Sequence, residues 1–332
     1  MEMWSEAGFD PDTIKRELHW AAELGMNAVR VFLHDLAWNT DKDAFLNRLD
    51  SFLTMAAEEG IRTMPVLFDD CWHEMALLGS KPEPKPGVHN SIWLQSPGLR
   101  AAKDKAQRGR LEGYVKAVVS RFAQDERILA WDIYNELGNF FLPILGMSKG
   151  KKQFLLAIQW FKFHVLPIPT LELFREAVVW ARDCDPSQPI TSAVYMNQSS
   201  LNKELMAHSD IVSFHNYRPA AELSRQIDAL SAENQPLLCT EYMARTAGST
   251  FASCLPVFKD RHIGCFNWGL VNGRTQTIYT WTDGGYKKGD GKQKPAQPEL
   301  WYHDMLNADG SPFDEEELRL FVKLVRGKEG SA

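Results

Sequence analysis

Two glutamates end apolar segments whose composition is that of β-strands. Segment 128–134 leads into Asn135 and Glu136, and segment 236–240 leads into Glu241. Buried parallel strands are near-continuous apolar runs, and their carboxyl ends lie at one edge of a sheet. Two carboxyl groups about 5–5.5 Å apart can hydrolyse a glycosidic bond, one as acid/base and the other as nucleophile. The sequence therefore predicts that Glu136 and Glu241 face each other across a pocket and cleave such a bond.

The elements that must hold these carboxylates alternate regularly between strand and helix. Asp10 is a typical N-cap, and Pro11 suits the first position of the helix that follows. We expect strands at 28–33, 61–68, 128–134, 189–195, 210–214, 236–240 and 262–268, and helices at 11–24, 43–59, 110–123, 171–183, 220–230, 250–259 and 314–325. This alternation predicts a parallel α/β fold. Polar residues at successive strand ends favour a (β/α)8 barrel over a doubly wound sheet.

An eight-stranded barrel requires one further strand before the helix at 11–24. Residues 1–9 contain no suitable segment, so we expect that the first β-strand is missing from this chain and lies before Met1. These residues also lack the basic and apolar regions of a secretory signal peptide. A signal could have been lost together with the strand, so the sequence leaves the localisation open, and a secreted or periplasmic full-length protein is compatible with it.

Length and composition indicate a globular enzyme. The 332 residues are 44% hydrophobic and 24% charged, which fits one catalytic barrel domain over residues 1–332. The net charge of −6 offers no basic surface for nucleic acid. The five cysteines are scattered without metal-ligand spacing, and no phosphate-binding glycine motif occurs. We therefore expect no metal and no cofactor.

An apolar insert at about 139–169 follows the segment that carries Glu136. Neither of its apolar halves reaches the roughly 20 residues of a membrane-spanning helix. We interpret it as a helical hairpin that forms a lid over the site. Docking to a membrane surface or a partner protein is the alternative.

The sequence Trp131-Asp-Ile-Tyr-Asn-Glu136 resembles the Asn-Glu signature of clan-A glycoside hydrolases, especially the cellulase-like family five, and the resemblance extends from Trp4 to about Val325. It implies that Glu136 is the acid/base, that Asn135 holds the sugar 2-hydroxyl and that Glu241 in Thr240-Glu-Tyr242 is the nucleophile.

The same resemblance implies further site residues. Arg30 would brace the nucleophile, His215 and Tyr217 would lie beside it, and Trp268 would form the floor of the sugar site. The chain departs from the family in having Leu137, where proline often follows the acid/base, and in lacking the first strand.

Other polar and aromatic residues near strand ends are candidate substrate ligands. We expect Asp69, Asp70, Trp72 and His34 to line the site, with helix capping as the rival role for the polar ones. Trp38 and Trp281 are weaker candidates for outer sugar platforms.

The leading hypothesis is a retaining β-glycosidase for a β-linked gluco- or manno-configured oligo- or polysaccharide. The alternative is a carbohydrate-binding barrel that has lost activity through truncation. An aldolase-like barrel ranks third, because it requires a lysine at a strand end and no expected strand ends in one.

Overall fold

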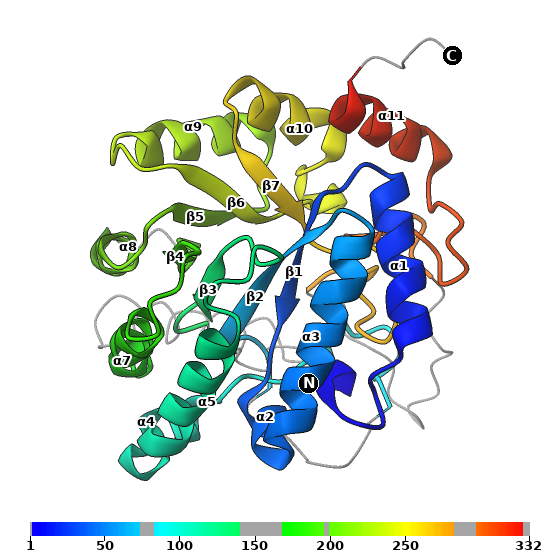
Figure 1. Ribbon diagram of the computed structural model, residues 1–332. Coiled ribbons are helices and arrows are strands. Elements are labelled where there is room, and N and C mark those ends of the chain that lie inside the picture. The colour runs from blue at the N-terminus through cyan, green and yellow to red at the C-terminus, as the bar shows by residue number, and fades with distance from the viewer. Residues whose placement is uncertain (1, 74–82, 140–167, 196–198, 282–296, 328–332) are drawn as a thin grey trace, which may run out of the picture.

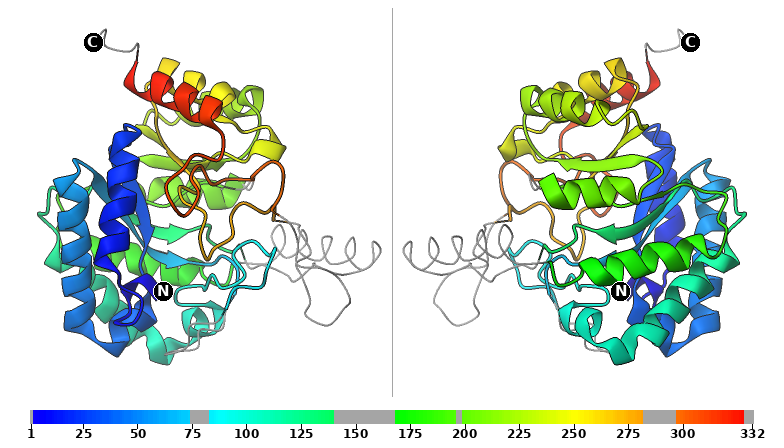
Figure 2. Two further views of the ribbon diagram at one scale, coloured as in Figure 1. Left: turned by 90° about the vertical axis from the view of Figure 1, so that its right-hand side faces the viewer. Right: turned by 90° about the vertical axis from the view of Figure 1, so that its left-hand side faces the viewer.

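The computed structural model describes residues 2–73, 83–139, 168–195, 199–281 and 297–327. Within these residues, parallel strands lie inside a layer of helices (Figures 1 and 2). The predicted alternation of strands and helices is confirmed, and the fold is of the (β/α)8 barrel type. Residues 140–167 of the predicted lid lie outside the described part of the chain.

Seven strands are present in the described residues: β1 (Ala28–Phe32), β2 (Arg62–Asp69), β3 (Trp131–Asn135), β4 (Ile190–Thr191), β5 (Val212–Asn216), β6 (Leu237–Tyr242) and β7 (Gly264–Asn267). The helices are α1 (Pro11–Glu23), α2 (Asp35–Thr40), α3 (Lys42–Glu58), α4 (Leu99–Lys103), α5 (Arg108–Arg121), α7 (Leu171–Arg182), α8 (Ser199–Ala207), α9 (Ala220–Ser231), α10 (Phe251–Asp260) and α11 (Glu315–Arg326). The sequence did not predict α2, α4 or α8.

The strand expected at 189–195 is reduced to the two residues of β4. Its backbone ladder to β3 ends early because the side chain of Ser192, and not a backbone carbonyl, accepts a hydrogen bond from the Tyr134 N–H at 3.1 Å. The chain then continues to an isolated bridge between Val194 and Phe214 of β5. That bridge links the two parts of the barrel.

The strands form two parallel ladders, β1-β2-β3-β4 and β5-β6-β7. In the described residues, no backbone pairing connects β7 to β1. A cavity of about 1110 Å³ runs along these two strands. The barrel is therefore not closed by hydrogen bonds at this position.

Local capping and packing explain the ring of helices. The Asp10 side chain accepts a hydrogen bond from the Thr13 N–H and so begins α1. At the other end of the chain, α11 lies beside α1 (Figures 1 and 2), and Arg326 donates hydrogen bonds to the carbonyls of Ala22 and Glu23. These bonds satisfy carbonyls that the end of α1 leaves free.

One expectation fails in this layer, and for another residue the rival role is observed. Trp38 is buried against Tyr114, so it belongs to the core and offers no outer sugar platform. His34 follows the end of β1 by two residues and is the N-cap of α2, which was the rival role expected for it; its Nδ1 accepts a hydrogen bond from the Leu36 N–H at 3.2 Å.

In the described part of the chain, no helix combines the length and the apolar character that a membrane span requires.

Candidate active site

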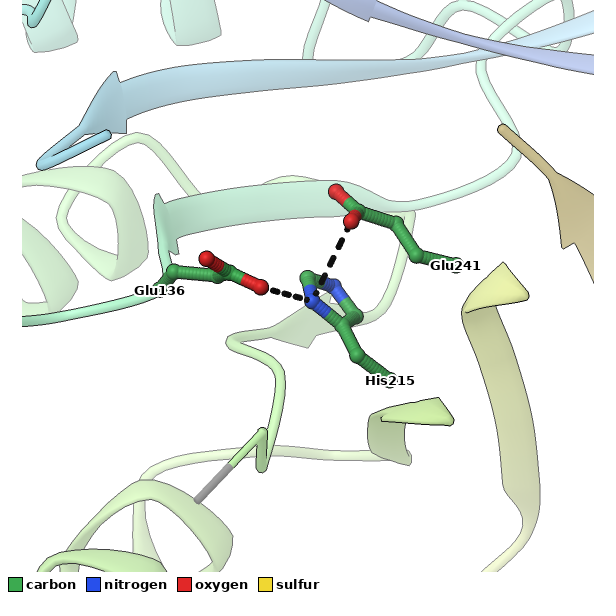
Figure 3. Close-up of side chains that lie close together, drawn as sticks. All are labelled: Glu136, His215 and Glu241. Carbon is green, nitrogen blue, oxygen red and sulfur yellow. Dashed lines mark hydrogen bonds and ion pairs between the residues drawn. The ribbon is translucent and has the colours of Figure 1, made fainter. Parts of the chain in front are cut away.

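Glu136 directly follows the last residue of β3, in a strained backbone conformation. Its φ angle of 43° lies in the left-handed region, which non-glycine residues rarely adopt. The turn is completed by a hydrogen bond from the Asn139 N–H to the Glu136 carbonyl at 2.9 Å. Such strain persists where the surrounding structure fixes it, and it concentrates at functional sites. The turn directs the Glu136 side chain toward β5 and β6 (Figure 3).

Glu241 belongs to β6, and irregular pairing surrounds it. The β5–β6 register shifts between Phe214 and His215, and the β6–β7 register shifts between Cys239 and Tyr242. Bulges of this kind change the direction of side chains and are common next to active sites. They accompany the convergence of His215 and Glu241 on one point.

His215 lies between the two glutamates, as Figure 3 shows. Its Nδ1 is 2.8 Å from Glu136 Oε1 and 3.4 Å from Glu241 Oε2. One oxygen of each carboxyl group and a ring nitrogen of His215 all lie within 4.8 Å of one another. The predicted convergence of Glu136 and Glu241 is thus present in the structure.

Arg30 connects Glu241 to the strand that carries Asn135. Its Nη1 donates to Glu241 Oε1 at 2.7 Å, and its Nη2 donates to Asp132 Oδ2 at 2.7 Å and to Asn135 Oδ1 at 2.6 Å. Burial disfavours the charged guanidinium, but the carboxylates of Asp132 and Glu241 outweigh it and raise the pKa of Arg30 above its usual value. Arg30 therefore remains a cation in contact with Glu241.

The second oxygen of Glu241 is held by Tyr217, whose hydroxyl donates to Oε2 at 2.7 Å. Both oxygens of Glu241 thus accept a hydrogen bond, one from a charged donor and one from a neutral donor. Donors to a carboxylate fix its orientation and favour its ionised form.

Burial governs the titration of the central residues. It raises the pKa of Glu136, although the hydrogen bonds from Cys71 and Asn139 act to lower that pKa. It also raises the pKa of Glu241, where the positive charge of Arg30 opposes it. Burial lowers the pKa of His215 to about 4, so this imidazole is neutral at pH 7.

Aromatic rings lie near the residues of the site, and Phe32, Trp93 and Trp268 line the cavity next to β1 and β7. Trp268 contacts Phe32 with ring centroids 5.6 Å apart and Trp93 at the same distance. Trp281 packs edge-on against Tyr217 at 5.0 Å and is 36% exposed. Trp72 stacks on His89 at 5.2 Å. Flat apolar surfaces of this kind can support sugar rings.

Asp69 and Asp70 lie at the end of β2, as expected, but their oxygens contact protein groups. Asp69 accepts hydrogen bonds from Asn135 Nδ2 at 2.9 Å and from Trp93 Nε1 at 2.6 Å. Asp70 accepts from the Tyr134 hydroxyl at 2.8 Å, from the Gly138 N–H at 2.6 Å and from the Thr170 hydroxyl at 2.6 Å. These contacts brace the turn after β3. Direct contact of Asp69, Asp70 or His34 with substrate stays a prediction.

Sequence reasoning missed four residues of the site: Asp132, Cys71, Asn139 and Trp93. Asp132 carried a usable signal, because a charge inside a buried apolar strand must have a partner. Cys71 had no such signal, since its role depends on how the loops after β2 and β3 meet; Asn139 lies in the turn of Glu136 itself, where its type suggested only a turn former.

Glu136, His215 and Glu241 are also the described residues whose atoms are close enough to share a metal ion. The Arg30 guanidinium already supplies positive charge at Glu241, and the chemistry considered below requires no ion.

Comparison with known proteins finds one relative over part of the chain and solved structures of similar fold over almost all of it. No protein-family model matches the chain. The mannan endo-1,4-beta-mannosidase A of Emericella nidulans is 29% identical over 98 residues, which are 30% of this chain and 23% of that relative. The chain thus matches about a quarter of its relative's length.

Solved structures resemble almost the whole chain. A GH5_18 protein from Streptomyces cattleya, in complex with Manβ1-4GlcNAc, has a TM-score of 0.62 at 14% identity and covers 99% of this chain and 78% of its own. The endo-β-1,4-mannanase from Thermotoga petrophila has a TM-score of 0.56 at 16% identity, covering 97% and 75%. The exo-β-1,4-mannosidase Op5Man5 from Opitutaceae bacterium strain TAV5 has a TM-score of 0.59 at 19% identity, covering 99% and 57%. At these identities the likeness establishes the fold of the chain.

Proposed function

We propose that this chain is a retaining β-glycosidase that acts on β-linked manno- or gluco-configured oligo- or polysaccharides, with residues 1–332 as one catalytic domain. The observation that carries the proposal is the approach of Glu136 and Glu241, whose nearest carboxyl oxygens lie within 4.8 Å. Retaining enzymes hold their carboxyl groups about 5–5.5 Å apart, whereas inverting enzymes leave room for a water molecule at about 6.5–9.5 Å.

The surroundings of the two glutamates suit different roles. Glu241 is oriented by Arg30 and Tyr217 through both of its oxygens, as a nucleophile requires. The Glu136 side chain is only 13% exposed, and this burial favours its protonated form. A carboxyl group with a raised pKa can serve as a general acid.

The reaction then proceeds in two displacements. Glu241 attacks the anomeric carbon while the proton of Glu136 passes to the leaving oxygen. Glu136, now ionised, removes a proton from a water molecule that attacks the glycosyl–Glu241 ester and restores both residues. Trp268, next to Phe32 and Trp93, supplies the apolar floor under the reacting sugar.

The names of the similar proteins guide the choice of substrate. The relative from Emericella nidulans is a mannosidase, and those from Thermotoga petrophila and Opitutaceae are a mannanase and a mannosidase. We therefore place β-mannosides first and β-glucosides second among the substrates to be tested. Our proposal includes neither a nucleic-acid partner nor a membrane partner.

Azide rescue tests the assignment of the two glutamates. We expect Glu241→Ala to abolish turnover of aryl β-mannosides and azide to restore it as an α-glycosyl azide, because azide enters from the face that the nucleophile used. Glu136→Ala with azide is expected to give the β-glycosyl azide, since the covalent intermediate still forms from an activated aryl glycoside. Glu222→Ala, on the exposed face of α9, is the matched control and should leave activity unchanged.

Undiminished hydrolysis by Glu241→Ala would refute the assignment of Glu241 as the nucleophile. If the wild-type chain binds mannan or β-glucan oligosaccharides without hydrolysing any aryl glycoside or oligosaccharide, the result favours the carbohydrate-binding alternative.

A further inference from the structure

A thiol contacts the carboxyl group that we propose as acid/base. Cys71 lies just beyond the end of β2, and its Sγ is 3.2 Å from Glu136 Oε2. The side-chain amide of Asn139, three residues after Glu136, donates to the same oxygen. Cys71 is also tied into the site by its backbone N–H, which donates to Asp69 Oδ1 at 3.0 Å.

The two oxygens of Glu136 thus have different partners. An amide N–H can only donate, so the contact with Asn139 makes Oε2 an acceptor. A proton on Oε2 would crowd the Asn139 N–H and remove the acceptor that Cys71 needs. Oε1 has no such pair of donors. It contacts Nδ1 of His215 at 2.8 Å, and the neutral imidazole can accept a hydrogen bond at this nitrogen.

Cys71 is suited to donate and not to react. Burial raises the pKa of its thiol well above the usual value, and the nearby carboxylates of Asp69 and Glu136 act in the same direction. A thiol that stays protonated can serve as a weak hydrogen-bond donor.

We propose that Cys71 and Asn139 are positioning residues that hold Glu136 Oε2 as an acceptor, so that the proton delivered to the leaving group resides on Oε1. The inference rests on the proposed function and deepens it.

The proton balance of the first displacement follows. The O–H bond at Glu136 Oε1 breaks and its proton passes to the glycosidic oxygen. The bond from that oxygen to the anomeric carbon breaks with its electron pair remaining on oxygen, and the carboxylate of Glu241 bonds to the carbon. Cys71 keeps its proton throughout, and its hydrogen bond strengthens as Glu136 becomes negative, because bonds to an ionised acceptor are stronger.

The pH profile of kcat/KM tests this role. Loss of a donor to a carboxylate raises the pKa of that carboxyl group. The fall of kcat/KM on the alkaline side, the basic limb of the profile, reports the pKa of Glu136. We therefore expect this limb to lie about one pH unit higher in Cys71→Ala than in the wild type. Cys71→Ser keeps an O–H donor and should retain most of the wild-type limb. Cys254→Ala, a buried thiol of α10, is the matched control and should not shift the limb.

The leaving group provides a second readout. We expect Cys71→Ala to lower kcat/KM severalfold for an alkyl β-mannoside, which needs protonation, and hardly at all for a dinitrophenyl β-mannoside, which does not. An equal loss of kcat/KM for both substrates, with the basic limb of the pH profile unshifted, would indicate a structural role alone and would overturn the inference.

A measurement without turnover separates this inference from the proposed function. The infrared S–H stretching band of Cys71, identified by its loss in Cys71→Ser, is expected to shift as Glu136 titrates and to be independent of pH in Glu136→Gln. A band that does not respond to pH in the wild type contradicts the contact, whether or not the chain hydrolyses glycosides. A responsive band in a chain without activity would support the contact while the proposed function fails.

Discussion

At the scale of the residue, Arg30 is the connecting group of the site. Its guanidinium contacts Glu241, Asp132 and Asn135 at once, at 2.6–2.7 Å for the shortest contact to each. Arg30 uses three nitrogens of a planar fork for these contacts, whereas a lysine ammonium would have to make them all from one nitrogen. The position of Glu241 relative to β3 therefore depends on Arg30.

We expect Arg30→Lys to lower kcat/KM by about a hundredfold or more, because displacement of a reacting group by about 1 Å has that effect. Kinetics on an aryl β-mannoside measure it. Arg261→Lys, at an exposed pair with Asp228, is the control, and equal activity of the two variants would contradict the role of Arg30.

Much of the site at this scale could be predicted from the sequence. Glu136, Glu241, Arg30, His215 and Tyr217 are predicted site residues that the structure brings into contact. Glu136 and Glu241 were predicted from strand ends, which are local features of the chain, whereas Arg30, His215 and Tyr217 were implied by the resemblance to clan-A glycoside hydrolases. Cys71 could not be predicted, because it meets an oxygen of Glu136 only when the segments after β2 and β3 lie together, and the contact of Asn139 depends on the turn that the chain makes after Glu136.

At the scale of the element, one edge of β1 pairs with β2, and in the described part of the chain no strand pairs with the other edge. The Leu33 N–H donates to Val66 and the Asn27 carbonyl accepts from Arg62, so these groups face β2. Backbone groups alternate in direction along a strand. Those of Ala28, Arg30 and Phe32 therefore face the cavity between β1 and β7, and the Phe32 carbonyl accepts from Trp4 Nε1 at 2.6 Å.

This geometry predicts uneven hydrogen exchange within β1. We expect the amides of Arg30 and Phe32 to exchange faster than those of Val29 and Val31, which face β2, since an amide without a ladder partner opens more easily. Residue-resolved exchange measures the contrast, with Trp131 of β3, bonded to the Pro189 carbonyl at 2.9 Å, as a protected reference. Equal protection along β1 would mean that its outer edge is covered in solution.

At the scale of the whole molecule, buried acids make stability depend on pH. Asp304 is fully buried, accepts one hydrogen bond from the Thr277 hydroxyl at 2.7 Å, and burial raises its pKa to about 7. Burial also raises the pKa of Asp69 to about 6 and that of Asp70 to about 7. The folded state therefore binds protons that the unfolded chain releases near pH 4.

The sign of the effect follows from linkage. Because the pKa of Asp304 is higher in the folded state, its contribution to stability is greatest below about pH 4 and is lost as pH rises through about 7. We expect the unfolding free energy of the wild type, relative to Asp304→Asn, to fall by about 3 kcal/mol from pH 5 to pH 8. Urea unfolding at both pH values measures it.

Glu222→Gln, on the exposed face of α9, is the control and should follow the wild type at both pH values. If the difference in unfolding free energy between the wild type and Asp304→Asn is the same at pH 5 and pH 8, Asp304 is not protonated in the folded state at pH 5.

The sequence by itself determined the alternation of strands and helices and the polar residues at strand ends, because hydrophobic period and capping residues act over a few neighbouring positions. It did not determine that Trp38 and His34 are buried, or that β4 is two residues long. Tertiary structure alone decided the pairing register with its two shifts near His215 and Glu241. It also decided that Cys71 and His215 reach the oxygens of Glu136, since these residues follow or belong to other strands and meet Glu136 only when the strands lie side by side.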